Sequence, residues 1–176
     1  SAALGLLPGD GSRPSVASAA LGLLPGDGPV ALVFRNLEAL NDSDTEKLKQ
    51  FAIDTGFAVF LQPGGVNSVV PLWPLETNLE FSIPEYDIRL AFKPLDFIQV
   101  NAALNRKMIQ QAIAMLDPQA GERVLDLFCG LGNFTLPLAR TAATVVGVEG
   151  EAGLVARARE NAELNNLKNC SFYNSE

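Results

Sequence analysis

The sequence contains no histidine and only two cysteines, Cys129 and Cys170. Without an imidazole, Ser-His-Asp and Cys-His catalytic units are excluded, because both use histidine as the general base. Two cysteines are too few for a structural zinc site, which usually takes four Cys or His ligands, and for the disulfide framework of a small secreted protein. We therefore expect no metal site in this chain.

Basic residues are also scarce: 13 lysines and arginines stand against 20 aspartates and glutamates, for a net charge of -7. This balance does not indicate a nucleic-acid-binding composition, so a surface for RNA would be a local patch or lie elsewhere. No apolar run approaches the ~20 residues of a membrane helix. The first residues lack the basic region of a signal peptide. We expect a cytoplasmic protein without membrane contact.

The chain has 176 residues, of which 48% are hydrophobic, enough to build a core in one ordinary or two small domains. Residues 1–11 and 18–28 both read SAALGLLPGDG. A repeat this short does not form a solenoid, which needs several stacked units to bury a core. We interpret residues 1–28 as a duplicated amino-terminal segment, derived either from an expression vector or from a recent duplication.

Residues 29–92 predict a small α+β central domain. The apolar stretch 29–35 is typical of a strand, and residues 41–44 offer N-caps for a helix over 45–55 that Gly56 ends. Further short strands are expected within 57–61, 66–74, 79–83 and 88–92, where prolines interrupt the pattern. We find no catalytic motif in this region and interpret it as a structural or substrate-contacting domain.

The pattern changes in residues 93–176. A helix is expected over 102–116, with one apolar face made of Leu104, Met108, Ala112 and Met115. Strands at 123–127, 143–148 and 170–173 alternate with helices that begin at 135 and span 152–165. This alternation predicts an α/β fold, the first half of a Rossmann-like doubly wound sheet. Because such sheets normally have more strands, we expect a fragment, or a second chain that supplies the rest.

A glycine loop, Gly130-Leu131-Gly132, directly follows the strand at 123–127 and precedes a helix. Glycines there allow a tight turn and let a cofactor approach the backbone. Asp126 lies at the end of the preceding strand. Glu149, 19 residues beyond Gly130, ends the next strand, where a carboxylate accepts hydrogen bonds from a ribose. We therefore expect a cofactor site rather than a plain turn.

Two classes of cofactor fit this layout. A dinucleotide fingerprint requires a third glycine where this sequence has Thr135, and Asp126 would repel a pyrophosphate. S-adenosylmethionine has no phosphate, and its methionine ammonium group is cationic, so an acidic strand end suits it. The residues favour S-adenosylmethionine over a nicotinamide dinucleotide.

Three segments, in this order, resemble one enzyme family: DFIQVN at 96–101, LDLFCGLGNFTLPLA at 125–139 and GVEG at 147–150. They are similar to the bacterial 23S rRNA (uracil-5-)-methyltransferases of the RumA/TrmA type, and closer to the rRNA branch than to the tRNA branch. The resemblance extends from about Pro29 to the end of the chain and is most specific after Phe92. It implies a class I S-adenosylmethionine-dependent enzyme that methylates C5 of uracil in 23S rRNA.

The resemblance also implies roles for individual residues. Gln99, Phe128 and Asn133 would contact the cofactor, Glu149 would hold its ribose, and Glu176 would lie near its adenine. From the residues alone, other roles stay open: Gln99 could cap the following helix, Phe128 could pack in the core, and Asn133 could occupy a left-handed turn. The predicted cofactor site is completed by Asp126, Gly130 and Gly132.

The chemistry of this family uses a cysteine thiolate that adds to C6 of uracil and a general base that removes the C5 proton. The resemblance places both after Glu176. It places an RNA-binding β-barrel and iron-sulfur cysteines before Ser1, so an iron-sulfur cluster is expected only in full-length members. Cys129 and Cys170 are interpreted as packing residues. We expect no catalytic residue in this chain, and weak or no cofactor affinity and no turnover from it alone.

Two alternatives remain open. One is a non-catalytic module that binds S-adenosylmethionine or RNA, which would fold as a native chain ending at Glu176. The other is a nicotinamide oxidoreductase, which would bind a dinucleotide tightly and would not respond to S-adenosylhomocysteine.

Overall fold

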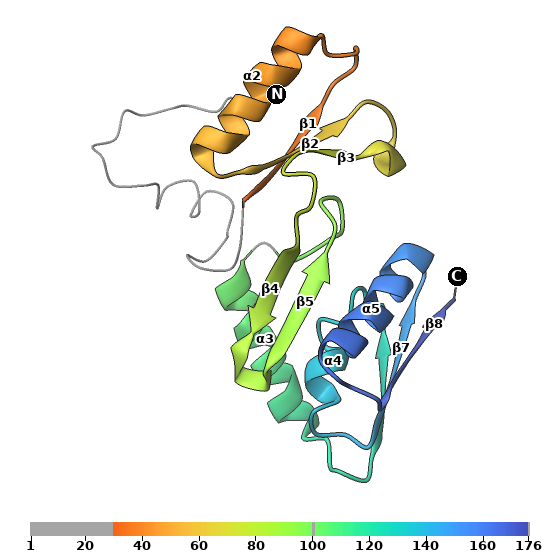
Figure 1. The fold of residues 1–176 in the computed structure, drawn as a ribbon. Helices are drawn as coiled ribbons and strands as arrows, with labels where there is room; N and C mark the ends of the chain where they lie inside the picture. The colour runs from red at the N-terminus through yellow and green to blue at the C-terminus, as the bar shows by residue number, and fades with distance from the viewer. Residues whose placement is uncertain (1–29, 100, 176) are drawn as a thin grey trace, which may run out of the picture.

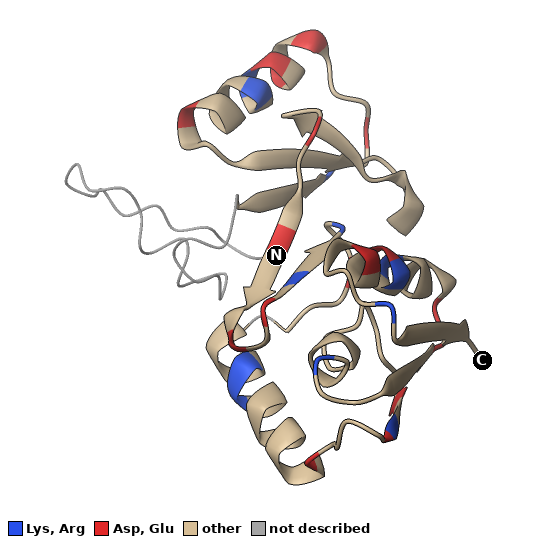
Figure 2. Cartoon of the chain, turned by 60° about the horizontal axis from the view of Figure 1, so that its bottom comes forward, with Lys and Arg blue, Asp and Glu red and all other residues tan. Residues whose placement is uncertain are grey.

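The computed structural model describes residues 30–99 and 101–175, arranged as a small upper unit and a larger lower unit (Figure 1). The duplicated segment at 1–28 and Glu176, the predicted adenine contact, lie outside the described residues. Within the described ranges no helix is both long enough and apolar enough to span a membrane. Acidic and basic positions are interspersed over both units (Figure 2).

The upper unit is a three-stranded sheet with one helix. Its elements, in chain order, are β1 (Ala31–Arg35), α2 (Asp42–Thr55), β2 (Ala58–Gln62), the 3-10 helix η1 (Val66–Ser68) and β3 (Val70–Trp73). Strands β1 and β2 are parallel neighbours joined through α2, and β3 runs antiparallel to β2. The strands and the helix expected here from the sequence are present, but the helix begins at Asp42 instead of residue 45, and part of the 66–74 stretch forms η1 instead of strand.

Local sequence explains where α2 begins and ends. The side chain of Asn41 accepts a hydrogen bond from the backbone N of Asp44 at 2.9 Å, and Gly56 ends the helix in a left-handed conformation with φ of 71°. Ala58 and Phe60 of β2 form a small core together with Leu79. Both helix ends are therefore set by residues that the sequence analysis identified.

An antiparallel hairpin connects the two units. Its elements are β4 (Leu79–Ile83), the 3-10 helix η2 (Pro84–Tyr86) and β5 (Ile88–Phe92). Leu79 belongs to the small core of the upper unit, whereas Ile83, Ile88 and Leu90 belong to the larger core of the lower unit. The hairpin contributes residues to the cores of both units. The domain boundary predicted between residues 92 and 93 therefore stays a prediction.

The lower unit contains a parallel sheet. Its elements, in chain order, are α3 (Ala102–Leu116), β6 (Arg123–Leu127), α4 (Thr135–Leu138), β7 (Thr144–Glu149), α5 (Ala152–Leu164) and β8 (Cys170–Asn174). The strand order is β6-β7-β8, and both pairs are parallel. This confirms the predicted α/β fold, with half of a Rossmann-like sheet.

Helix α3 has the predicted bounds, but the apolar stripe expected from the sequence faces outward. Leu104, Met108 and Met115 are exposed. The buried stripe is offset by one residue and contains Asn105, Ile109 and Ile113. The helix is apolar on two sides, and periodicity alone does not show which side meets the hairpin residues of the larger core.

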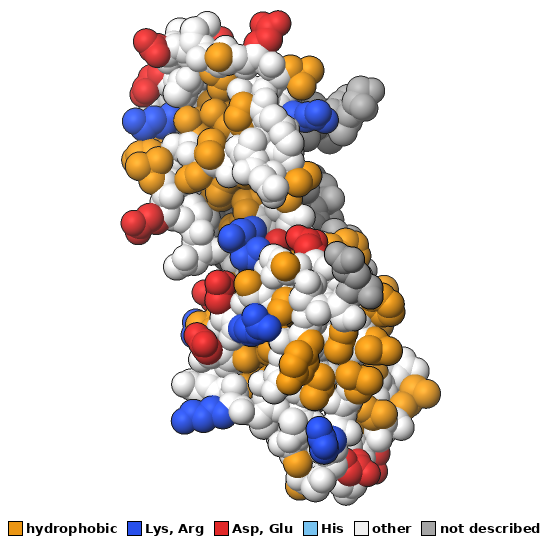
Figure 3. Space-filling view, turned by 90° about the vertical axis from the view of Figure 1, so that its right-hand side faces the viewer, with side chains coloured by type: hydrophobic (Ala, Val, Ile, Leu, Met, Phe, Trp, Pro, Cys, Tyr) orange, Lys and Arg blue, Asp and Glu red, His pale blue; other side chains and the backbone are white. Residues whose placement is uncertain are grey.

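One face of the lower sheet is open in the part of the chain that the structure describes. The register pairs Leu125 with Val146 and Leu127 with Val148, so these four side chains share one face. Leu125 and Leu127 are exposed, and among the described strands β6 pairs with β7 alone. Seen from the side of β8, hydrophobic side chains gather over the lower unit (Figure 3). An apolar open face and an unpaired edge are expected for half of a doubly wound sheet.

Candidate functional site

The glycine loop lies where β6 and β7 end side by side. Glu149, the last residue of β7, accepts a hydrogen bond from Gly130 N at 2.9 Å through Oε2 and one from Glu151 N at 3.1 Å through Oε1. The structure thus joins Gly130 and Glu149, which are 19 positions apart in the sequence. Each carboxylate oxygen keeps a second lone pair, so Glu149 can accept further hydrogen bonds from a ligand.

Both glycines of the loop adopt backbone conformations that other residues rarely take. The angle φ is 56° at Gly130 and 100° at Gly132. A Cβ on Gly132 would lie 3.0 Å from Leu136 Cγ, whereas a Cβ on Gly130 would meet nothing within 4 Å. The backbone of Gly130 therefore borders open space, where a ligand can approach closely.

Phe128 begins the loop with a φ of 60°, which is unusual for a bulky residue. Its side chain is 88% exposed, so the alternative that Phe128 packs in the core is wrong. A large side chain held in a left-handed conformation is strained, and such strain is found chiefly at binding and catalytic sites.

Asn133 is fixed by a reciprocal pair of hydrogen bonds with Asn105 of α3. The Nδ2 of each residue donates to the Oδ1 of the other, and both distances are 2.9 Å. Asn133 is not among the described residues with a positive φ, so the left-handed alternative is wrong. Asn105 was not predicted as a site residue. Its signal is a polar residue in the same helical stripe as Ile109 and Ile113, because a buried amide needs a hydrogen-bonding partner.

The segment that carries Gln99 is anchored on both sides. Before it, Asp96 forms a buried ion pair with Arg157 of α5, with Nε to Oδ2 at 2.5 Å and Nη2 to Oδ1 at 3.2 Å. After it, Asn101 caps α3 by accepting a hydrogen bond from Leu104 N at 2.9 Å. Asn101 is therefore the cap, and Gln99 is not. The side chain of Gln99 itself is exposed.

Asp126 lies near the end of β6, next to the loop. Its Oδ2 accepts a hydrogen bond from Thr135 Oγ1 at 2.6 Å. Burial raises the pKa of the Asp126 carboxyl above its usual value, and the hydrogen bonds from Thr135 offset part of that rise. Thr135 is fully buried where a dinucleotide fingerprint would have its third glycine. A partly buried carboxylate of this kind is stabilised in its ionised form by a cationic ligand.

Cys129 packs beneath the loop. A Cβ on Gly147 would lie 2.8 Å from Cys129 Sγ and 2.7 Å from Phe172 Cδ1, so only glycine fits at that point of β7. Burial, and then the carboxylates of Asp126 and Glu149, raise the pKa of the Cys129 thiol to about 12. Cys129 is buried in the larger core of the lower unit, as expected of a packing residue, and the raised pKa favours its neutral thiol.

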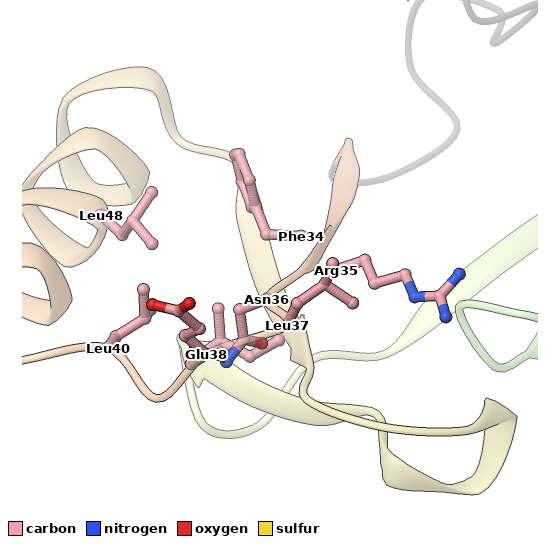
Figure 4. Close-up of a pocket in the computed structure, with 8 residues that line it drawn as sticks. Phe34, Arg35, Asn36, Leu37, Glu38, Leu40 and Leu48 are labelled. Carbon is pink, nitrogen blue, oxygen red and sulfur yellow. Dashed lines mark hydrogen bonds between the residues drawn. The ribbon is translucent and has the colours of Figure 1, made fainter. Parts of the chain in front are cut away.

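The upper unit contains a shallow hollow of about 510 Å³, shown in Figure 4. The residues that line it are Phe34, Arg35, Asn36, Leu37, Glu38, Leu40, Leu48 and Leu61. Arg35 points away from Leu48, so apolar side chains dominate the hollow (Figure 4). None of the residues predicted for the cofactor site lines it.

Neither the glycine loop nor the hollow of the upper unit contains a cluster of metal ligands in the described structure. Among residues 30–99 and 101–175, no group of three or more His, Cys, Asp or Glu side chains could hold a metal ion. The glycine loop, with its ordered carboxylates and amides, is therefore the candidate site that the described structure offers.

Comparison with known proteins identifies relatives of this chain. The family model described as tRNA (Uracil-5-)-methyltransferase matches residues 30–174. The 23S rRNA (uracil(1939)-C(5))-methyltransferase RlmD of Xanthomonas campestris pv. campestris (strain 8004) is 64% identical over 144 residues, which are 82% of this chain and 32% of that protein. The protein of the same name from Stenotrophomonas maltophilia (strain R551-3) is 56% identical over 147 residues, which are 84% of this chain and 33% of that protein. The chain thus spans about a third of the length of these curated relatives.

Solved structures with low sequence identity share the fold. The Pyrococcus abyssi tRNA (uracil-54, C5)-methyltransferase, solved in complex with S-adenosyl-L-homocysteine, has a TM-score of 0.60 at 18% identity, over 83% of this chain and 35% of that chain. The M. jannaschii tRNA m1G37 methyltransferase has a TM-score of 0.56 at 14% identity, over 84% of this chain and 46% of that chain. Both likenesses support the class I methyltransferase architecture.

Proposed function

Because the chain belongs to the tRNA (uracil-5-)-methyltransferase family, we propose that it forms the cofactor-binding part of an enzyme that methylates C5 of uracil in 23S rRNA. Relatives that are 56% and 64% identical are named for uracil 1939, which we propose as the target. Such an enzyme would act in the cytoplasm, on rRNA. The observation that carries the proposal is the glycine loop, bonded through Gly130 N to the carboxylate of Glu149.

S-adenosylmethionine is the proposed cofactor, and it supplies an electrophilic methyl group when bound. Glu149 would accept hydrogen bonds from the ribose hydroxyls through the lone pairs that its backbone contacts leave free. The open space beside Gly130 gives the cofactor access to the backbone, and the exposed ring of Phe128 borders the same loop. The strained φ of Phe128 supports a binding role for that residue.

The remaining predicted residues have supporting roles in this proposal. The carboxylate of Asp126 would favour the cationic methionine ammonium group. Asn133, held by Asn105, and Gln99, between Asp96 and the α3 cap, would also contact the cofactor. Gly132 would keep the turn tight, and Glu176 is proposed near the adenine on the family resemblance alone.

The loop does not favour a dinucleotide. Thr135 occupies the third glycine position and is hydrogen-bonded to Asp126. Helix α4, which follows, has only four residues, so its macrodipole offers little to a pyrophosphate. Neither cysteine is proposed as the nucleophile, because burial raises the pKa of Cys129 to about 12 and that of Cys170 to about 11.

Methyl transfer from labelled S-adenosylmethionine by the full-length gene product tests the proposal. We expect label on uracil C5 at one site of 23S rRNA, located by mass spectrometry of nuclease fragments. Glu149→Ala is expected to raise the KM for the cofactor about tenfold or more, through the loss of hydrogen bonds to the ribose. Glu160→Ala removes an exposed carboxylate of α5 and should leave that KM unchanged. Label on tRNA alone, or no transfer, would contradict the proposal.

A further inference from the structure

The outer edge of strand β5 is covered by the side chains of a helix. Strand β5 pairs with β4 on one side, and α5 lies along its other side (Figure 1). Asn165 of α5 accepts a hydrogen bond from Arg89 N at 2.8 Å and donates one to Arg89 O at 2.6 Å. Asn161 does the same one turn earlier, accepting from Ala91 N at 2.8 Å and donating to Ala91 O at 3.1 Å.

The spacing of the two asparagines matches the spacing of the strand. Residues four apart on a helix are separated by about 6 Å along its axis, and residues two apart on a strand by about 6.8 Å. Each side-chain amide accepts one hydrogen bond from a residue of β5 and donates one to the carbonyl of the same residue, as the backbone of a neighbouring strand would. Asn161 and Asn165 therefore take the place of a third strand beside β5.

Asn161 makes one contact that Asn165 does not. Its Nδ2 also donates to Leu131 O, between the two glycines of the loop, at 3.1 Å. The equivalent hydrogen of Asn165 goes to Asn161 O, within α5 itself. Asn161 is 0% exposed, so a lost hydrogen bond there cannot be replaced by water.

We infer that Asn161 is a positioning residue for the glycine loop. Its side-chain amide binds both the Leu131 carbonyl and the edge of β5. These bonds fix the position of the glycine loop relative to the β4–β5 hairpin. With Leu131 O fixed, Gly130 and Gly132 are kept in their positive-φ conformations, and the backbone of Gly130 stays open to a ligand. This inference rests on the proposed function, in that the ligand of the loop is S-adenosylmethionine.

Matched substitutions separate this role from a merely structural one. Asn161→Asp and Asn165→Asp each keep the oxygen that faces the strand and lose two donated hydrogen bonds, but only the first loses a bond to the loop. Hydrogen exchange in the full-length gene product is the first readout. Each variant keeps the acceptor of its strand amide, so exchange of the Arg89 and Ala91 amides should not separate the two variants. The Gly130 and Gly132 amides should exchange faster, by about tenfold, only in Asn161→Asp.

Cofactor binding is the second readout, measured by titration with S-adenosylhomocysteine. Asn161→Asp should raise Kd about tenfold relative to Asn165→Asp, and at saturating S-adenosylmethionine kcat should change little. If the buried carboxylate prevents folding, Asn161→Ser and Asn165→Ser provide a neutral pair for the same two measurements.

The outcomes distinguish the two ideas. Equal effects of the two substitutions on loop exchange and on Kd would overturn the positioning role and leave the proposed function intact. Failure of the unaltered protein to bind S-adenosylhomocysteine would overturn the proposed function, and the exchange comparison would still decide whether Asn161 holds the loop.

Discussion

The two units of this molecule are held by different kinds of polar contact. Within residues 30–77, every side-chain hydrogen bond of the described structure joins residues no more than four positions apart. In the hairpin and the lower unit, such bonds join Arg89 to Asn165, 76 positions apart, and Asp96 to Arg157, 61 positions apart. Apart from the ammonium group of Lys49, which lies 5.1 Å from the centre of the Trp73 ring, the upper unit is specified by local hydrogen bonds and apolar burial, and the lower unit also by long-range hydrogen bonds.

Three of the long-range contacts in the lower unit meet at the candidate site. The long-range contacts of Asn105, Glu149 and Asn161 all end on the glycine loop, at Asn133, Gly130 and Leu131 respectively. Buried polar contacts of this kind add modestly to stability, but they favour one arrangement of the groups that they join. The glycine loop would need such contacts to keep its backbone and side-chain groups at fixed positions for a ligand. The sheet of the upper unit has no such requirement.

Breaking the buried ion pair should have the largest effect. Arg157→Met leaves the Asp96 carboxylate buried without its partner, and we expect a loss of about 3–5 kcal/mol in the free energy of unfolding. Arg89→Met removes an exposed partner of Glu80 and should cost about 1 kcal/mol or less. Thermal unfolding followed by circular dichroism checks both. Similar losses in the two variants would show that the Asp96–Arg157 pair does not hold the structure as argued.

The two asparagine caps offer a more selective test. Asn41 and Asn101 each accept a hydrogen bond from the third following backbone N at 2.9 Å, so alanine at either position should cost about 1 kcal/mol. Only Asn101→Ala should also weaken binding of S-adenosylhomocysteine, because Asn101 ends the segment that carries Gln99. Calorimetry of both variants decides this. An equal loss of affinity from Asn41→Ala would mean that the upper unit shapes the cofactor site.

The sequence predicted the elements well because their signals are local. Asn41 and Gly56 set the ends of α2, and the strand-helix alternation after residue 122 was enough to predict the parallel sheet. The link between Gly130 and Glu149 was also predictable, because the distance along a βαβ unit places both residues at adjacent strand ends.

The rest depends on which surfaces meet. Helix α3 has two apolar sides, and its period does not show that Ile109 and Ile113, rather than Leu104 and Met108, face the core. The partner of Asn105 is 28 positions away, and those of Asn161 are 30 and 70 positions away. A single sequence carries no signal for such pairs, because the pairing is decided only when the hairpin, helix and loop are packed together.

The smallest expected effects concern two carboxylates, Glu85 and Asp126. We expect ionised Glu85 to stabilise the folded state and ionised Asp126 to destabilise it. Arg106 lowers the pKa of Glu85, so the ionised form stabilises the folded state, and this contribution is lost as pH falls through the lowered pKa. Burial raises the pKa of Asp126, so ionised Asp126 costs stability above that raised pKa, and the cost disappears below the ordinary value. At neutral pH, Glu85→Gln should lower Tm and Asp126→Asn should raise it, by roughly a few degrees at most. Both differences should shrink as the pH is lowered, that of Asp126 as the pH falls through its raised pKa and that of Glu85 as the pH falls through its lowered pKa.

Asp126→Asn keeps an oxygen that can accept from Thr135, so the gain in Tm should come from removing the charge alone. In the same variant, affinity for S-adenosylhomocysteine should fall, because its ammonium group loses the opposite charge. A higher Tm combined with weaker binding would show that the loop keeps a destabilising carboxylate for its ligand. A lower Tm at neutral pH would instead place Asp126 with Glu85, among the charges that hold the fold.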